Sequence, residues 1–147
     1  MTPSLCVIDT NVIVSGLIGG DSNSPPARIL DAMLDGEISY LMSSELLDEY
    51  LTVLRRPRLV LVHGLTEEEL DHLLTDLVAN AVWREPVDEP VSTGFAPDPG
   101  DNHLWALLAS HSQALLVTGD RLLLERPPGD ASVISPRHFV EMFLQRS

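Results

Sequence analysis

The sequence predicts an α/β protein, a three-layer α/β/α sandwich with a mostly parallel central sheet. Short apolar runs rich in β-branched residues alternate along the chain with longer segments of helical periodicity. Two of these runs, 5–8 and 115–118, lead into the acidic residues Asp9 and Asp120, as is typical of strands that end at a site. The 147 residues fit one hydrophobic core, so we expect a single domain spanning residues 1–147.

The first third of the chain is expected to contain a strand and a helix separated by a loop. Leu5–Ile8 is a short apolar run of the buried-strand type. Residues 12–18 stay apolar without a clear period, and the polar residues 19–24 predict a loop. Pro25 opens a helix, because proline suits a first turn, and Gly36 ends it.

The following elements are predicted by capping residues and by apolar stripes. A strand is expected at 38–42, then a helix at 45–54 that Ser43 or Ser44 caps and Pro57 bounds. Thr66-Glu67-Glu68-Glu69 is a capping box for a helix reaching about residue 80. The remaining elements, in order, are a strand at 81–84, a loop at 88–100, a helix at 102–112, a strand at 115–118, a turn or short helix at 121–124, a strand at 132–134 and a helix at 136–145.

The composition predicts a cytoplasmic protein that does not contact a membrane. The apolar fraction of 44% is ordinary for a globular chain, and no apolar run approaches the roughly 18 residues that span a bilayer. The first residues carry no basic stretch, so a signal peptide is not expected. The single cysteine, Cys6, excludes an internal disulfide and suits a reducing compartment.

The number and type of the charged residues exclude several classes of enzyme. The net charge is −13, which predicts weak nonspecific affinity for nucleic acid or a basic partner, although bound cations would add positive charge at a site. All nine basic residues are arginines, and the lack of lysine excludes P-loop and Schiff-base chemistry. The lack of lysine also disfavours response-regulator receiver domains and phosphatases of the haloacid dehalogenase type, and the latter normally have a second Asp where this chain has Asn11.

Four acidic residues lie at the edges of apolar runs: Asp9, Glu49, Asp101 and Asp120. The carboxyl ends of parallel strands meet at one edge of a sheet, so several of these charges would repel unless a divalent cation joined them. A turn or helix-cap role explains any single one of them equally well, but not the coincidence of all four. Because no histidine or cysteine cluster accompanies them, the expected cation is Mg²⁺ or Mn²⁺. His103 is expected to face along its helix.

The order of the motifs resembles the PIN-domain nucleases over nearly the whole chain. The motifs are Val7-Ile8-Asp9-Thr10-Asn11-Val12, Glu49 on a helix, Asp98-Pro99-Gly100-Asp101-Asn102 and Val117-Thr118-Gly119-Asp120. The resemblance is closest to bacterial PIN-family toxin components, the VapC-like group. It implies Mg²⁺- or Mn²⁺-dependent cleavage of single-stranded RNA by Asp9, Glu49, Asp101 and Asp120, with Asn11 and Thr118 orienting them. The third acid stays open between Asp98, which also suits a turn, and Asp101, which is nearer the helix start and is preferred.

The same resemblance implies partners, which the sequence does not identify. In the toxin interpretation a cognate antitoxin protein blocks the site, and the chain forms a homodimer. The alternative is a PIN-like nuclease, or a protein-binding module, outside any toxin–antitoxin pair. Residues 59–62 are apolar and are expected to be buried core rather than an interface. The basic cluster at residues 55–58 serves equally well as a helix C-terminus whose charges complement the dipole. The candidate RNA contacts are Arg28, Arg55, Arg56, Arg58 and Arg121.

Overall fold

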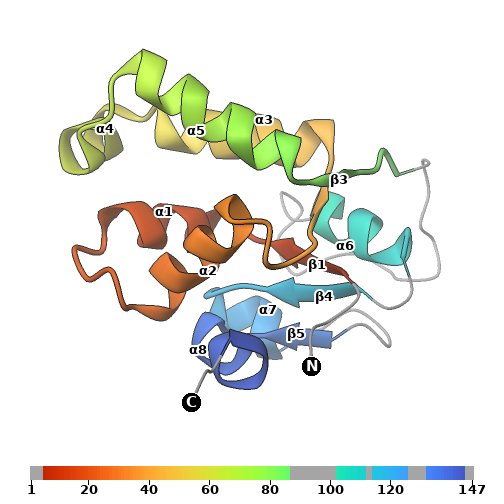
Figure 1. The fold of residues 1–147 in the computed structure, drawn as a ribbon. Helices are drawn as coiled ribbons and strands as arrows, with labels where there is room; N and C mark the ends of the chain where they lie inside the picture. Colours follow the sequence, from red (N-terminus) through yellow and green to blue (C-terminus); the bar gives the residue numbers. More distant parts are fainter. Residues whose placement is uncertain (1–4, 87–101, 112–113, 126–131, 145–147) are drawn as a thin grey trace.

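The computed structural model describes residues 5–86, 102–111, 114–125 and 132–144 (Figure 1). Its strands are all parallel and form two small sheets, β1-β4-β5 and β2-β3. An isolated parallel bridge between Cys6 and Tyr40 joins the sheets, so the strands follow the order β3-β2-β1-β4-β5. Their bounds are β1 Leu5–Ile8, β2 Leu41–Met42, β3 Val82–Trp83, β4 Ala114–Val117 and β5 Ser132–Ile134. The predicted α/β class is confirmed.

The strand order creates a reversal point between β1 and β4. The chain moves from β1 outward to β2 and β3, and then returns to place β4 on the other side of β1. In open parallel sheets, sites form outside the carboxyl ends of the strands at such a reversal. Asp9 and Thr118 directly follow β1 and β4, and the ladder continues to them, since Asp9 N–H donates to the Val117 carbonyl (3.0 Å). The two motifs therefore meet at this edge.

The helices surround these strands. Figure 1 shows α3, α4 and α5 gathered at one end of the molecule, with α7 and α8 at the opposite end. None of the described helices is long and apolar enough to cross a bilayer. Their bounds are α1 Thr10–Ile18, α2 Pro25–Leu34, α3 Ser44–Leu54, α4 Pro57–His63, α5 Glu67–Ala79, α6 Asn102–Ala109, α7 Arg121–Glu125 and α8 Pro136–Phe139, the last continuing as a π-helical turn at Val140–Leu144.

The predicted capping residues begin and end their helices. Ser43, rather than Ser44, caps α3 by accepting the Leu46 N–H (3.1 Å). The capping box of α5 is complete, with both bonds between Thr66 and Glu69 formed. Gly36 follows the end of α2 at φ 74°, a left-handed conformation that glycine adopts without strain. These ends were predictable because each depends on residues within one turn.

Residues 12–18, predicted only as an irregular apolar segment, form most of helix α1. The helix starts because the Asp9 side chain caps it, accepting the Thr10 N–H. It then packs closely on α2: a Cβ added at Gly16 would lie 2.9 Å from the Pro26 carbonyl oxygen. Close contact on more than one side hides the periodicity that would reveal a surface helix.

The expectation that residues 59–62 are buried core is wrong. Pro57, predicted to bound the preceding helix, also begins α4, and no residue of α4 is buried. Leu61 and Val62 have exposed fractions of 85% and 59%. Helix α4 contacts α1 and α3, but the side chains of Leu61 and Val62 point into solvent. The apolar segment is therefore a surface, and its earlier alternative, an interface, stays open.

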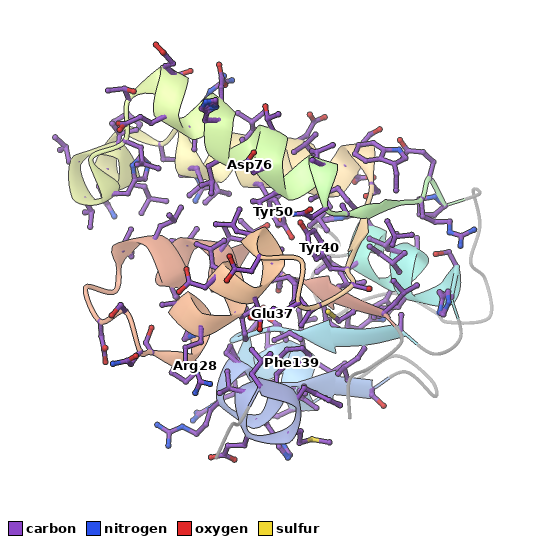
Figure 2. The ribbon with its side chains drawn as sticks, in the orientation of Figure 1. Arg28, Glu37, Tyr40, Tyr50, Asp76 and Phe139 are labelled. Carbon is purple, nitrogen blue, oxygen red and sulfur yellow. The ribbon has the colours of Figure 1, made fainter. Side chains whose placement is uncertain are left out.

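Two buried tyrosines fix the helices against the strands that lead to the candidate site. The Tyr50 hydroxyl of α3 donates to the carbonyl of Ile8, the last residue of β1. The Tyr40 hydroxyl, beside β2, donates to the Leu77 carbonyl of α5 (Figure 2). Burial raises the pKa of Tyr50 well above its ordinary value, so this hydroxyl remains a donor. Tyr50 thereby sets the position of its neighbour, Glu49, relative to the end of β1.

Candidate active site

Asp9 is a buried carboxylate at the end of β1, with an exposed fraction of 5%. Its Oδ1 accepts the Thr10 N–H at 2.8 Å. Its Oδ2 accepts two side-chain donors, the Thr118 hydroxyl at 2.7 Å and the Asn11 amide at 3.2 Å. Three hydrogen bonds hold the carboxylate in one orientation, and they leave a lone pair of Oδ1 available to a further ligand.

Thr118 and Asn11 join the first motif to the last. The fully buried Thr118 hydroxyl donates to Asp9 and accepts both the Asn11 amide (3.2 Å) and the Asp120 N–H (3.0 Å). The Asn11 side-chain oxygen accepts the Gly119 N–H at 2.9 Å. These hydrogen bonds hold the Thr-Gly-Asp turn against Asp9 and Asn11.

Asp120 lies at the start of α7, half-buried beside this network. Its Oδ1 accepts the Leu122 N–H at 2.9 Å, so the side chain also caps the short helix. The cap uses one oxygen and leaves Oδ2 without a described protein donor. Both roles weighed for a strand-end acid, helix cap and ligand, are therefore compatible at this position.

Glu49 reaches the same region from α3. Its Oε2 accepts the Thr10 hydroxyl, and its Oε1 lies 2.8 Å from Nε2 of His103. The His103 side chain is buried at the start of α6, with an exposed fraction of 5% against 29% for Glu49. We expected His103 to face along its own helix, and this expectation is wrong. A helical wheel of α6 shows a buried position but cannot show that α3 presents an acid to it.

The electrostatics show that Asp9 faces two other acids. Burial raises the pKa of Asp9, and the negative charges of Glu49 and Asp120 raise it further, against the hydrogen bonds from Thr118 and Thr10. The pKa of Glu49 is instead lowered, first by its hydrogen bond from His103 and then by Thr10 and the positive charge of Arg56, against its burial. The negative charge of Asp9 is therefore disfavoured by its surroundings, and a cation beside it would compensate that charge.

The acids are neighbours without forming a closed cage in the described part of the chain. Within residues 5–86, 102–111, 114–125 and 132–144, no three His, Cys, Asp or Glu side chains are grouped closely enough to hold an ion. Asp98 and Asp101, the two candidates for the third acid, lie outside the described residues. The charged groups that act on Asp9 in the described residues, Glu49 and Asp120, are carboxylates, whose oxygens are the ligands that Mg²⁺ and Mn²⁺ prefer.

Two of the candidate arginines bind other parts of the described chain, and three are exposed without a described side-chain hydrogen bond or ion pair. Arg28 donates to the Leu144 carbonyl (2.8 Å) and so ties α2 to the carboxyl-terminal helices. Arg55 pairs with Glu67 (3.1 Å) and Asp71 (3.8 Å) of α5. The other three are exposed: Arg56, Arg58 and Arg121. Two of these, Arg56 and Arg58, line an open pocket of about 480 Å³ at the start of α4.

One comparison with known proteins bears on the fold. The family model described as PIN domain matches residues 6–122, well over half of the chain. The chain therefore belongs to the PIN-domain family. No curated protein and no solved structure matches it. PIN domains are generally nucleases, hydrolases that use divalent metal ions, and the predicted nuclease class is confirmed at this level.

Proposed function

We propose that this protein is a metal-dependent ribonuclease that hydrolyses phosphodiester bonds in single-stranded RNA. The observation that carries the proposal is the buried Asp9 carboxylate, which Thr118 and Asn11 hold beside the charges of Glu49 and Asp120. Burying a charge next to two like charges is costly. A divalent cation offsets that cost, and the motif-bearing strand ends supply the oxygen ligands it needs.

In this proposal Asp9 and Asp120 are the main ligands of Mg²⁺ or Mn²⁺. When bound, the cation supplies an acidified water and neutralises charge on the scissile phosphate. Thr118 and Asn11 keep Asp9 in place, and Glu49 holds the cation or orients water. Because no described group of three acids holds an ion by itself, we assign the missing oxygen to the third motif, Asp101 before Asp98.

Removal of divalent metal is expected to abolish cleavage. A labelled single-stranded RNA oligonucleotide should stay intact when it is incubated with chelator-dialysed protein. Added Mn²⁺ or Mg²⁺ should restore hydrolysis, because the cation is what acidifies the water and neutralises charge on the phosphate. Duplex RNA and single-stranded DNA of the same sequence are the matched substrates. Full cleavage in chelator would contradict the metal assignment, and equal cleavage of the DNA would contradict the choice of RNA.

Arg56 is the arginine we expect to contact the RNA backbone. It is exposed and lines the open pocket, and its positive charge lowers the pKa of Glu49, so it lies near that acid. Arg56→Ala should weaken RNA binding and lower the slope of log affinity against log salt by about 0.7, the value for one phosphate contact to a single strand. Arg55→Ala is the control, because Arg55 is engaged with α5. Fluorescence anisotropy over a salt series checks this, and equal effects of both variants would contradict it.

We also propose two protein partners. A basic antitoxin would be drawn to a chain of net charge −13, and its association would occlude the acidic site. A second copy of the chain would cover the exposed Leu61 and Val62 of α4. Molar mass from light scattering tests both, for the chain alone and for the chain co-expressed with the product of the adjacent reading frame. A monomer in both samples would contradict both proposals.

A further inference from the structure

Glu49 is held by side chains on both of its oxygens. The Thr10 hydroxyl donates to Oε2, and His103 Nε2 lies 2.8 Å from Oε1. An ionised carboxylate only accepts hydrogen bonds, so Nε2 of His103 carries the proton that points to Glu49. That nitrogen is therefore a donor to the carboxylate and not a ligand of a cation.

The two donors come from segments that carry other motifs. Thr10 begins α1 directly after Asp9, whereas His103 lies near the start of α6, two residues after Asp101 in the sequence. Helix α6 packs against α3, the helix of Glu49, and also against β1 and β4. Because Glu49 is bonded to both segments, its carboxylate is fixed relative to α1 and to α6. Two of its four lone-pair sites remain for other ligands.

We propose that His103 is a positioning residue, which with Thr10 clamps Glu49 in the orientation that the nuclease site requires. The inference rests on the proposed function, in which Glu49 holds the cation or orients water. Hydrogen bonds that orient a ligating carboxylate commonly change metal affinity or activity about 10–100-fold when removed. The burial of His103 supports the role, because a buried donor keeps one geometry and meets no competing water.

A pair of substitutions of similar size separates positioning from packing. Glutamine at position 103 carries an N–H donor about as far from the backbone as Nε2, whereas the asparagine amide ends near the position of Nδ1. We expect His103→Asn to lower Mn²⁺ affinity about 10–100-fold in titration calorimetry, and His103→Gln to recover most of the loss. His72→Ala, on the exposed face of α5, is the control and should bind Mn²⁺ as the wild type does.

The steady-state kinetics provide a second measurement. His103→Asn should lower kcat for RNA cleavage at saturating Mn²⁺ with little change in KM, because His103 acts on Glu49 and not on the RNA. If the folded Asn and Gln variants have the same Mn²⁺ affinity and the same kcat as each other, whether at the wild-type values or below them, the inference is overturned. Asp9→Asn is measured alongside them. If Asp9→Asn also retains wild-type affinity and rate, the proposed function fails; if only the position-103 variants retain them, the clamp alone fails.

Discussion

Asp9→Asn is expected to lower the rate of RNA cleavage by about 10³-fold or more. Metal-ion catalysis contributes several kcal/mol to transition-state stabilisation, and each roughly 1.4 kcal/mol is a factor of ten in rate. Asparagine keeps the shape of the side chain and an oxygen that can cap α1, but it loses the charge that holds the cation. Single-turnover cleavage of a labelled RNA measures the loss, and a rate within tenfold of wild type would contradict the ligand role of Asp9.

The fold should survive this substitution, and the pH dependence of stability distinguishes lost chemistry from lost structure. Burial raises the folded-state pKa of Asp9 above its ordinary 3.8, so ionised Asp9 costs stability. That cost is absent below about pH 3.8 and grows as the pH rises through the folded-state pKa. In chelator, the free energy of unfolding of Asp9→Asn relative to wild type should therefore increase from pH 4 to pH 7. Chemical denaturation checks this, and a decrease would contradict the account.

Thr118→Val is expected to cause the largest loss of stability at the site. Valine matches threonine in shape, but it removes a fully buried hydroxyl that donates to Asp9 and accepts from Asn11 and the Asp120 N–H. Each buried polar group left without a partner costs about 1–3 kcal/mol, so we expect a total loss of about 2–3 kcal/mol in the free energy of unfolding. Cleavage should fall about 10–100-fold, because Asp9 loses its shortest hydrogen bond.

Thr118→Ser is the matched control for that substitution. Serine keeps the hydroxyl and loses one methyl group, so it should retain most of the activity and lose roughly 1 kcal/mol of stability. Denaturant melts and cleavage rates of the two variants are compared side by side. If valine and serine reduce cleavage equally, the hydroxyl network does not orient Asp9, and Thr118 contributes only packing.

The sequence was informative about the edge of the sheet where the motifs meet. Asp9 and Asp120 each follow an apolar run, and parallel strands bring their carboxyl ends to one edge, so their proximity was predictable without coordinates. The caps at Ser43 and at Thr66 were predictable too, because a cap involves residues only three apart.

Interactions between distant segments were not predictable in the same way. The Asn11 amide bonds to Thr118, which is 107 residues away, and no local pattern selects that partner. The orientation of His103 was predicted from its own helix, whereas the residue that it contacts, Glu49, belongs to α3. Helix α1 begins Thr-Asn-Val-Ile-Val, a weak helix-forming sequence by propensity, and tertiary contacts override that preference. Leu61 is exposed because no described element covers its side of α4, and a local apolar run does not predict that.

The central claim is that Asp9 and Asp120 hold one divalent cation together with Glu49 and the third motif. Anomalous diffraction from crystals grown with millimolar Mn²⁺ tests it directly. We expect an anomalous peak whose distance to a carboxylate oxygen of both Asp9 and Asp120 is within about 0.2 Å of the roughly 2.1 Å of Mg²⁺ coordination. Well-diffracting crystals with no peak between these two residues, or with Mn²⁺ bound only elsewhere, would contradict it.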